Sequence, residues 1–488
     1  MPLSPSESAL VSSVPTGLFV AGEWRESSDR SRFDVEDPAT GEVVASVADA
    51  TVADGDAALA AASAAQEAWA RTAPRERGEL LRAAYELLIE RTEHFARLIS
   101  LEMGKPLAEA RGEVAYGAEF FRWFSEEAVR IDGRWMTAPN GATRLLTLRK
   151  PVGPTLMVTP WNFPLAMGTR KIGAAIAAGC TMVVKPATQT PLTMLALADL
   201  LREVGVPAGV VNVFATTRTA EVMEPLVRDP RARKLTFTGS TGVGRLLVEQ
   251  SATQLLRLSM ELGGNAPFIV FEDADLDAAV EGALLAKMRN MGEACTAANR
   301  FLVHESVADA FAERLAEQMS RMPVGRGADD GAEVGPLIDA KALAKVTELV
   351  DDATRRGARV ACGGKAVGEA GYFFAPTVLT DVPADADLLR EEIFGPVAPI
   401  TTFATEDEAV ASANDTEYGL AAYVYTRDVS RVVRLGERLE FGMVGVNTGI
   451  VSNPAAPFGG VKASGFGREG GFEGIEEYLE TTYLGIAL

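Results

Sequence analysis

From Val152 onward, short apolar runs alternate with helix-like segments, and this alternation constrains the fold more than any other feature of the chain. The runs lie at residues 155–159, 181–184, 210–214, 234–237 and 256–260. Strands that alternate with helices are typical of βαβ units, which build a parallel sheet. Ligands bind such sheets at the carboxyl ends of the strands. A second alternating region, residues 267 to about 444, predicts a second α/β domain.

The segment before Val152 lacks this alternation of apolar runs and helical patterns. Residues 1–14 are expected to form a loose terminus, and residues 17–41 contain strand-like pieces separated by turn signals. Helical patterns follow at residues 57–70, 75–103 and 107–131, and residues 143–149 alternate like a strand.

Composition excludes several classes of function. A chain of 488 residues is long enough for about three domains. Its net charge of −20 argues against nucleic acid or an anionic membrane as the main partner. No secretory signal or membrane-length apolar run is found, and three cysteines are too few for a disulfide framework. The cytoplasm is therefore the expected compartment.

The chain has only two histidines, His94 and His304. A three-histidine metal site is therefore impossible, and neither CxxC nor HExxH spacing occurs. We expect no metal, and if the chain is an enzyme, a carboxylate is the favoured base.

Among the three cysteines, Cys295 has the most distinctive setting. Cys180 lies in an apolar run and Cys362 in a strand that enters a glycine turn, and both are expected to be structural. Cys295 follows a helix and has small, polar neighbours, which leave room for a substrate carbon to approach the sulfur. Its spacing alone does not decide between a nucleophile and an inert thiol.

Three further segments carry groups with possible chemical roles. The glycine-rich turn at residues 238–245 lies between a strand and a helix, where it forms either a phosphate site or only a tight turn. Glu261 ends a strand and faces either a cleft or solvent. Asn162 lies in a loop fixed by two prolines, where its amide either stabilises an oxyanion or caps the next helix.

Together these segments resemble the aldehyde dehydrogenase family, and the resemblance spans nearly the whole chain. It rests on a fixed order of motifs: Pro160-Trp-Asn-Phe-Pro164, Lys185-Pro-Ala187, Phe237-Thr-Gly-Ser240, Glu261-Leu-Gly-Gly264, Gly292-Glu-Ala-Cys295, Glu392-Ile-Phe-Gly-Pro396 and Pro457-Phe-Gly-Gly460. One departure is Glu293, where many relatives carry Gln.

The resemblance implies an α/β fold with three parts. A Rossmann-like dinucleotide-binding domain comprises residues 1–127 and 148–262, and an α/β catalytic domain comprises residues 263–469. A small β oligomerisation element comprises residues 128–147 and 470–488. In that element residues 133–150 would form a hairpin, and residues 478–486 would form a strand that pairs with another subunit, in a homodimer or homotetramer.

A mechanism is also implied. Cys295 would attack the aldehyde carbon, and the Asn162 amide, with the Cys295 backbone N–H, would hold the oxyanion. Hydride would pass to the nicotinamide ring, leaving a thioester, and Glu261 would activate the water that releases the acid.

The cofactor contacts follow from the same resemblance. They are Thr159, Trp161, Lys185, Thr188, Gly239, Ser240, Leu262, Glu392 and Phe394. Ser240 would lie at the pyrophosphate, Lys185 at the adenosine ribose and Glu392 at the nicotinamide ribose. NAD-preferring relatives often carry Glu at position 188, where it repels a 2′-phosphate. The neutral Thr188 predicts that NADP is preferred and that NAD is the second cofactor.

Three segments, residues 185–191, 290–300 and 445–452, resemble the succinate-semialdehyde dehydrogenases of this family. That branch recognises the distal carboxylate of its aldehyde with two arginines and a serine, which match Arg170, Arg289 and Ser452. A guanidinium matches a carboxylate bidentately. Succinate semialdehyde is therefore the expected substrate.

Other substrates and other functions remain as alternatives. Glutarate semialdehyde is one methylene longer, and a methylene changes discrimination by only ~1–3 kcal/mol. A broad-specificity aldehyde dehydrogenase is a further alternative. A non-catalytic structural or binding member is disfavoured because Cys295, Asn162 and Glu261 are all present. A CoA-acylating enzyme is disfavoured because Glu261 supplies a hydrolytic base.

Overall fold

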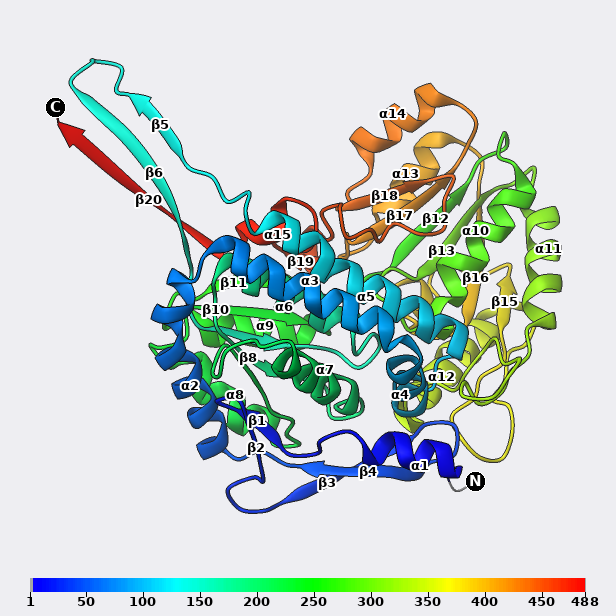
Figure 1. Cartoon of the computed structure of the whole chain (residues 1–488). Coiled ribbons are helices and arrows are strands. Elements are labelled where there is room, and N and C mark those ends of the chain that lie inside the picture. The colour runs from blue at the N-terminus through cyan, green and yellow to red at the C-terminus, as the bar shows by residue number, and fades with distance from the viewer. Residues whose placement is uncertain (1–2, 488) are drawn as a thin grey trace.

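The computed structural model describes residues 3–487, in which two large sheets with flanking helices lie side by side and a three-stranded arm projects from them (Figure 1). This arrangement confirms the predicted α/β class. No helix among residues 3–487 combines the length and the apolar character needed to cross a bilayer.

The first sheet has eight strands and a parallel centre. Its order is β19 (Gly465–Phe466), β11 (Arg257–Glu261), β10 (Lys234–Thr238), β7 (Thr155–Val158), β8 (Met182–Lys185), β9 (Val211–Val213), β1 (Leu18–Val20) and β2 (Glu23–Arg25). Strands β7, β8 and β10 are buried along their whole length, as expected for parallel strands covered on both faces.

Helices cover both faces of this sheet. One apolar cluster joins one face to α3 (Pro74–Glu90), α4 (Thr92–Met103), α5 (Leu107–Glu127), α6 (Ala166–Ala178) and α7 (Leu192–Glu203). A second cluster joins the other face to α2 (Val52–Arg71), α8 (Thr219–Val227) and α9 (Thr241–Ser251). In chain order, β8 and β9 are added on one side of β7, and β10 and β11 are then added on its other side. The strand order therefore reverses between β7 and β10, where α/β sheets bind their ligands.

The second sheet has seven strands, all parallel except β14 at its edge. Its order is β14 (Arg359–Cys362), β15 (Thr377–Thr380), β16 (Val397–Phe403), β13 (Ala298–His304), β12 (Ala266–Val270), β17 (Ala421–Tyr425) and β18 (Met443–Val446). Its helices are α10 (Leu276–Met288), α11 (Ala308–Arg321), α12 (Ala340–Arg356), α13 (Glu406–Asn414) and α14 (Val429–Arg438).

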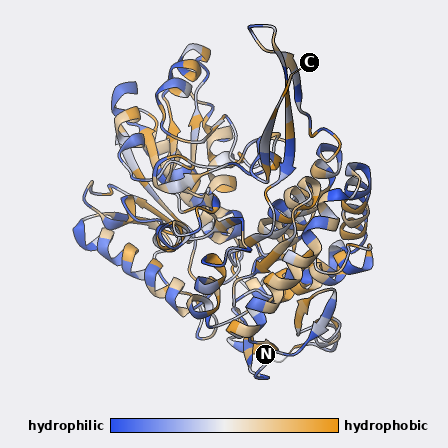
Figure 2. Ribbon diagram, turned by 90° about the vertical axis from the view of Figure 1, so that its left-hand side faces the viewer, coloured by the Kyte–Doolittle hydropathy of each residue, from blue (hydrophilic) through white to orange (hydrophobic). Residues whose placement is uncertain are grey.

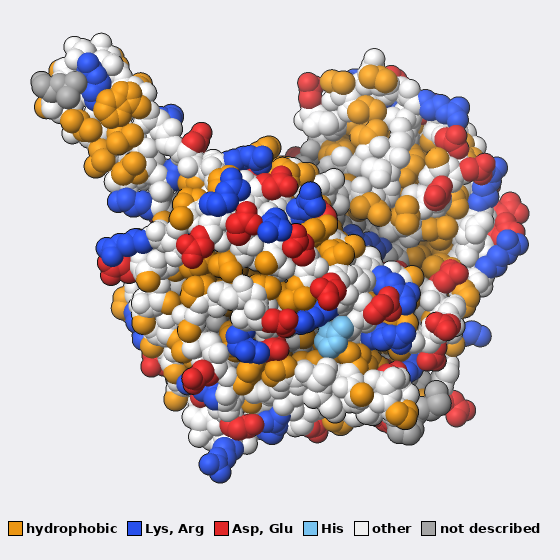
Figure 3. Space-filling view, viewed as in Figure 1, with side chains coloured by type: hydrophobic (Ala, Val, Ile, Leu, Met, Phe, Trp, Pro, Cys, Tyr) orange, Lys and Arg blue, Asp and Glu red, His pale blue; other side chains and the backbone are white. Residues whose placement is uncertain are grey.

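The arm consists of β5 (Arg134–Thr137), β6 (Thr143–Pro151) and β20 (Leu479–Ala487). All three strands are antiparallel, and β20 pairs with β6 of the same chain along its whole length. The arm stands away from the body in both ribbon views (Figures 1 and 2). Hydrophobic side chains gather on it in the space-filling view (Figure 3), and Trp135 and Tyr483 are 62% and 61% exposed.

The boundaries of the three expected parts of the chain remain predictions. Strand β6 runs across the expected boundary at 147/148. Strand β19, from the segment expected to be catalytic, pairs with β11 of the first sheet.

Two local expectations were wrong. Within the expected loose terminus, α1 (Pro5–Ser12) forms, because Ser4 and Glu7 make a capping box and Pro5 suits the first helical turn. The helix expected at 75–103 is two helices, α3 and α4, which meet at Arg91 in a non-helical conformation. The remaining short elements are β3 (Arg32–Asp37), β4 (Glu42–Ala48) and α15 (Glu473–Glu476).

Candidate active site

A cavity of about 290 Å³ opens at the point where the strand order of the first sheet reverses. We call it the nucleophile cavity. It is lined by Pro160, Trp161, Asn162 and Met167 beyond β7, Thr238, Gly239 and Ser240 at the end of β10, Glu261, Leu262 and Gly263 at the end of β11, and Cys295, Ile338, Asp339, Ala342, Lys345, Glu392, Ile393 and Phe394 from the second half of the chain. The three expected catalytic side chains, Asn162, Glu261 and Cys295, thus face one space.

Cys295 lies in the loop between a short 3₁₀ helix, Arg289–Gly292, and β13. Burial raises the pKa of its thiol to about 12, against the opposing positive charge of Arg170. The loop passes very close to Gly264, where a Cβ atom would lie 2.3 Å from the Cys295 carbonyl oxygen. Only glycine therefore allows the connection from β11 to β12 to run this close to the nucleophile.

The amide of Asn162 is held in one orientation. Its Oδ1 accepts the Phe163 backbone N–H at 3.1 Å, and its Nδ2 donates to the Glu293 carbonyl oxygen at 3.0 Å. Because an amide nitrogen carries two N–H bonds, the second stays available beside the cavity. A fixed, buried donor near a sulfur nucleophile suits an oxyanion that forms on a carbonyl.

Glu261 ends β11 and is only 2% exposed. Neither of its carboxyl oxygens has a hydrogen-bond partner among residues 3–487. Burial raises its pKa well above the usual range, and the nearby Glu469 raises it further. A buried carboxyl group that lines the same cavity as the thiol can, once ionised, take a proton from a water molecule there, as a general base requires.

The N-terminus of α9 borders the cavity and could hold a phosphate. Gly239 and Ser240 lie directly before its first turn, where backbone N–H groups point outward. Two buried hydroxyls, Thr159 Oγ1 and Thr238 Oγ1, have no hydrogen-bond partner among residues 3–487. Lys185 ends β8 nearby in the sheet, and burial lowers its pKa to about 8. Unpaired hydroxyls and a desolvated ammonium fit a dinucleotide at this edge.

The opposite wall carries the residues expected at the nicotinamide end. Glu392 Oε1 accepts the Gly264 backbone N–H at 3.1 Å, and burial raises the Glu392 pKa to about 7. Phe394 packs edge-on against Trp161 with ring centroids 5.4 Å apart, and Leu262 completes this part of the lining.

Thr188 lies in the loop between β8 and α7 and is half-buried. Its hydroxyl donates to Gln189 Oε1 at 3.3 Å. Thr188 and Gln189 are both uncharged. Neither side chain would therefore repel an anionic group, such as a phosphate, that binds at this loop.

A second cavity, of about 470 Å³, contains two of the three expected carboxylate-binding residues. We call it the arginine cavity. It is lined by Glu109, Gly112, Glu113, Tyr116, Phe163, Leu284, Leu285, Met288, Arg289, Met322, Ile450 and Ser452. Arg289 lies over the rings of Phe163 and Tyr116, at 4.9 and 5.5 Å from their centroids. It has no ion pair or hydrogen bond among residues 3–487, so its charge is uncompensated by a direct contact.

The structure does not bring Arg170 into the arginine cavity. Its guanidinium is fully buried and forms an ion pair with Glu469, which also pairs with Lys171. The guanidinium also donates to Met167 Sδ at 3.2 Å and lies over the Phe458 ring, with the centroid 4.1 Å away. Arg170 therefore has an internal carboxylate as its partner, and the expected contact with a substrate carboxylate remains a prediction.

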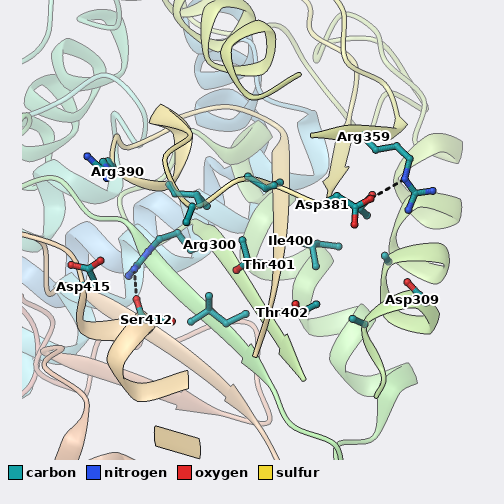
Figure 4. Close-up of a pocket in the computed structure, with 17 residues that line it drawn as sticks. Arg300, Asp309, Arg359, Asp381, Arg390, Ile400, Thr401, Thr402, Ser412 and Asp415 are labelled. Atoms are coloured by element: carbon teal, nitrogen blue, oxygen red, sulfur yellow. Dashed lines mark hydrogen bonds and ion pairs between the residues drawn. The ribbon is translucent and has the colours of Figure 1, made fainter. Parts of the chain in front are cut away.

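A further cavity, of about 410 Å³, lies on the second sheet and contains none of the expected site residues (Figure 4). There Arg300 donates to the Ser412 carbonyl oxygen at 2.8 Å, and Arg359 pairs with Asp381. Arginine and aspartate side chains line it in equal number. The candidate chemistry is therefore in the nucleophile cavity and the arginine cavity. Asn162 lines the nucleophile cavity, and the next residue, Phe163, lines the arginine cavity.

Sequence reasoning missed several residues of the site. Thr238 is the first residue of the glycine-rich turn, and its position at a strand end was a usable signal. Lys105, Asn290 and Glu469 gave no such signal, because their contacts are long-range. Lys105 and Asn290 both donate to the Asn162 carbonyl oxygen, and Glu469 pairs with Arg170. Among residues 3–487, no group of three or more His, Cys, Asp or Glu side chains could hold a metal ion.

Known proteins resemble this chain over nearly its whole length. A succinate-semialdehyde dehydrogenase of Paenarthrobacter nicotinovorans is 60% identical over 91% of this chain and 99% of its own. An NADP(+) succinate-semialdehyde dehydrogenase of Escherichia coli strain K12 is 53% identical, and a glutarate-semialdehyde dehydrogenase of Pseudomonas putida is 51% identical; both alignments cover 96% of this chain and 97% of the relative.

The fold agrees with this likeness. The crystal structure of an E. coli NADP-dependent enzyme matches with a TM-score of 0.96, at 51% identity, over 100% of both chains. The sequence model of the aldehyde dehydrogenase family matches residues 24–484. Since that match covers far more than half of the chain, and the relatives align over almost all of it, this chain belongs to the aldehyde dehydrogenase family.

Proposed function

We propose that this enzyme oxidises succinate semialdehyde to succinate with NADP as its preferred cofactor. The observation that carries the proposal is Arg289. Its guanidinium lies in a cavity beside the nucleophile loop, stacked on two aromatic rings, and it forms no direct ion pair with a carboxylate of residues 3–487. A half-buried arginine in this state favours a substrate that brings its own carboxylate.

The reaction begins with Cys295. Its thiol gives its proton to the ionised Glu261 carboxylate, which passes that proton on to solvent, and the sulfur attacks the aldehyde carbon to form a thiohemiacetal. Asn162 Nδ2 and the Cys295 backbone N–H donate to the resulting oxyanion. The nicotinamide, when bound, accepts hydride and so supplies the oxidising power of the reaction. Glu261 then takes a proton from a water molecule, which attacks the thioester carbon and releases the acid and the Cys295 thiol.

At the other end of the substrate, Arg289 and the Ser452 hydroxyl would hold the carboxylate in the arginine cavity. Arg170 is already paired with Glu469 and would not contact the substrate carboxylate. It would instead act on Cys295 through its positive charge, which lowers the Cys295 pKa. This assignment separates the two arginines that sequence reasoning had placed together.

For the cofactor, Gly239 and Ser240 would hold the pyrophosphate at the α9 N-terminus, with Thr159 among the flanking polar groups. Lys185 and Thr188 would face the adenosine ribose and its 2′-phosphate. Glu392 would bind the nicotinamide ribose, with Trp161, Leu262 and Phe394 around the ring. The NADP named in relatives supports this preference, and NAD is the second cofactor.

The alternative substrate is glutarate semialdehyde, because relatives with that name are 51% identical to this chain. Steady-state kinetics with both semialdehydes, each with NADP and with NAD, test the proposal. We expect the highest kcat/KM for succinate semialdehyde with NADP. A higher kcat/KM for glutarate semialdehyde than for succinate semialdehyde would show that glutarate semialdehyde is the preferred substrate. No NADPH or NADH formation with either semialdehyde would refute the enzymatic function.

We further propose that the chain works as a homodimer or homotetramer in the cytoplasm. The support for assembly is the arm, whose strands β5 and β20 leave unpaired edges beside exposed apolar side chains.

A further inference from the structure

A strained turn separates Arg289 from the nucleophile. Asn290 and Met291, neither of them glycine, have φ angles of 54° and 55°, in the left-handed region. Gly292 follows with a φ of 79°. Two successive non-glycine residues rarely adopt this conformation, and they keep it only when surrounding contacts hold them there.

Asn290 supplies those contacts. It is completely buried, and its backbone N–H donates to Glu109 Oε2 at 2.5 Å. Its side-chain Nδ2 donates to two backbone carbonyl oxygens, that of Asn162 at 3.1 Å and that of Glu293 at 2.9 Å. Both partners are carbonyl acceptors, so the amide orientation is unambiguous.

These two carbonyls belong to the segments that carry the proposed oxyanion donors. The Asn162 carbonyl also accepts from Lys105 Nζ at 2.8 Å, and the Asn162 side chain donates to the same Glu293 oxygen at 3.0 Å. Glu293 lies two residues before Cys295, whose backbone N–H is the second donor. One buried amide therefore links the loop of Asn162 to the loop of Cys295.

The loop of Asn162 has a second support. Lys105 forms a buried ion pair with Glu113 at 2.5 Å, and Glu113 Oε1 accepts the Leu165 and Ala166 N–H groups at 2.9 and 3.2 Å. The loop is thus fixed to α5 independently of Asn290. Loss of the Asn290 amide should therefore change the alignment of the two loops and leave each loop folded.

We propose that Asn290 is a positioning residue, which sets the distance and direction between the Asn162 amide and the Cys295 backbone N–H. This inference rests on the proposed function, because it assumes that those two groups form the oxyanion site. It predicts that Asn290 affects reactions that build an oxyanion and spares reactions of the thiol that build none.

Two reactions of the same sulfur separate these effects. Hydrolysis of p-nitrophenyl acetate without cofactor requires attack on a carbonyl and so builds an oxyanion. Alkylation by iodoacetamide displaces iodide from carbon and builds none. The variants are Asn290→Gly, which removes the amide and accommodates the left-handed φ, and Asn290→Asp, which keeps the shape but replaces the donor with an acceptor.

We expect each variant to slow acylation by p-nitrophenyl acetate on the order of 10-fold to 100-fold, and to change the alkylation rate less than threefold. Asn162→Ala should give a similar loss, and Asn162→Ala combined with Asn290→Gly should be little slower than Asn162→Ala alone, since Asn290 acts through Asn162. Asn447→Gly is the matched control: Asn447 also has a left-handed φ and bonds Thr426 with its side-chain amide, outside both cavities.

Several outcomes would overturn the inference. Acylation unchanged in Asn290→Gly and Asn290→Asp, with Asn162→Ala impaired, refutes the role of Asn290 and leaves the oxyanion site intact. Equal losses in acylation and alkylation also refute it, because they indicate a displaced thiol. If Asn162→Ala itself acylates normally, the failure lies in the proposed function.

Discussion

Glu469 forms a buried ion pair with Arg170, and both side chains lie almost entirely out of solvent. Removing one partner of such a pair leaves a charge without full compensation, which costs about 3–5 kcal/mol, less here because Lys171 also contacts Glu469. We predict that Arg170→Met lowers the thermal unfolding temperature by several degrees. Differential scanning fluorimetry at neutral pH measures this change.

Arg289→Met should behave in the opposite way, because Arg289 has no ion pair within the described part of the chain, residues 3–487. A hydrogen bond to a charged group contributes about 1.5–3 kcal/mol, so KM for succinate semialdehyde should rise about 10-fold to 100-fold. The unfolding temperature should stay nearly constant, and KM for butyraldehyde, which lacks the carboxylate, should change little. Equal KM increases for both aldehydes would contradict the assigned role.

Thr188→Glu should reverse the cofactor preference. A carboxylate at this position would repel the 2′-phosphate of NADP and would leave the ribose hydroxyls of NAD with an acceptor. We expect kcat/KM with NADP to fall on the order of 10-fold or more, while kcat/KM with NAD falls less or rises. Thr188→Gln, of the same length but uncharged, is the control, and a similar loss of NADP activity there would point to size instead of charge.

Reactivity of the free thiol should depend steeply on pH. Burial raises the Cys295 pKa to about 12, so only a small fraction is thiolate near neutrality. In the absence of cofactor, inactivation by iodoacetamide should accelerate about tenfold per pH unit between pH 7 and 9, without a plateau. Measured rates that level off below pH 9 would show a thiol with a much lower pKa.

The arm should control assembly. Trp135 on β5 and Tyr483 on β20 are 62% and 61% exposed, and replacing both with Glu puts charge on the apolar surface that a partner subunit would cover. We predict dissociation to monomers in analytical ultracentrifugation. Val429→Glu, on a residue 75% exposed in α14, is the control and should leave the assembly unchanged. Persistence of the oligomer in the double variant would locate the interface elsewhere.

Much of the fold was predictable because its signals are local. The apolar runs before Thr159 and Gly239 are strands whose carboxyl ends meet, and this places Trp161 and Ser240 at one edge of the sheet. The break at Arg91 had no comparable signal, since neither glycine nor proline marks it.

The site was less predictable because its contacts are long-range. The local setting distinguished Cys295 from the other two cysteines but did not decide whether it is a nucleophile, and only the ordered series of motifs indicated that role. Arg170 and Glu469 lie 299 positions apart in sequence, so no periodicity could reveal that they pair. The left-handed turn at Asn290 is likewise stabilised by Glu109, a residue of a distant helix.

The effect of Glu261 on the stability of the fold should depend on pH. Burial raises its pKa well above the usual range, so the folded state keeps the proton that the unfolded chain releases above about pH 4.3. Its stabilising effect is complete below that pH and is lost as pH rises through the raised pKa. Glu261→Gln cannot ionise, so the variant should gain unfolding temperature relative to the unmodified enzyme as pH increases from 4.5 to 8.

Glu469 supplies the control with the opposite sign. The positive charges of Arg170 and Lys171 lower its pKa in spite of burial, so it stabilises the fold at neutral pH and loses this effect as pH falls. The deficit of Glu469→Gln should therefore stay nearly constant from pH 8 to about pH 5 and should shrink only below about pH 4.3, as pH falls toward the lowered pKa. Parallel pH trends in the two variants would contradict the assignment of the proton to Glu261 and of the charge to Glu469.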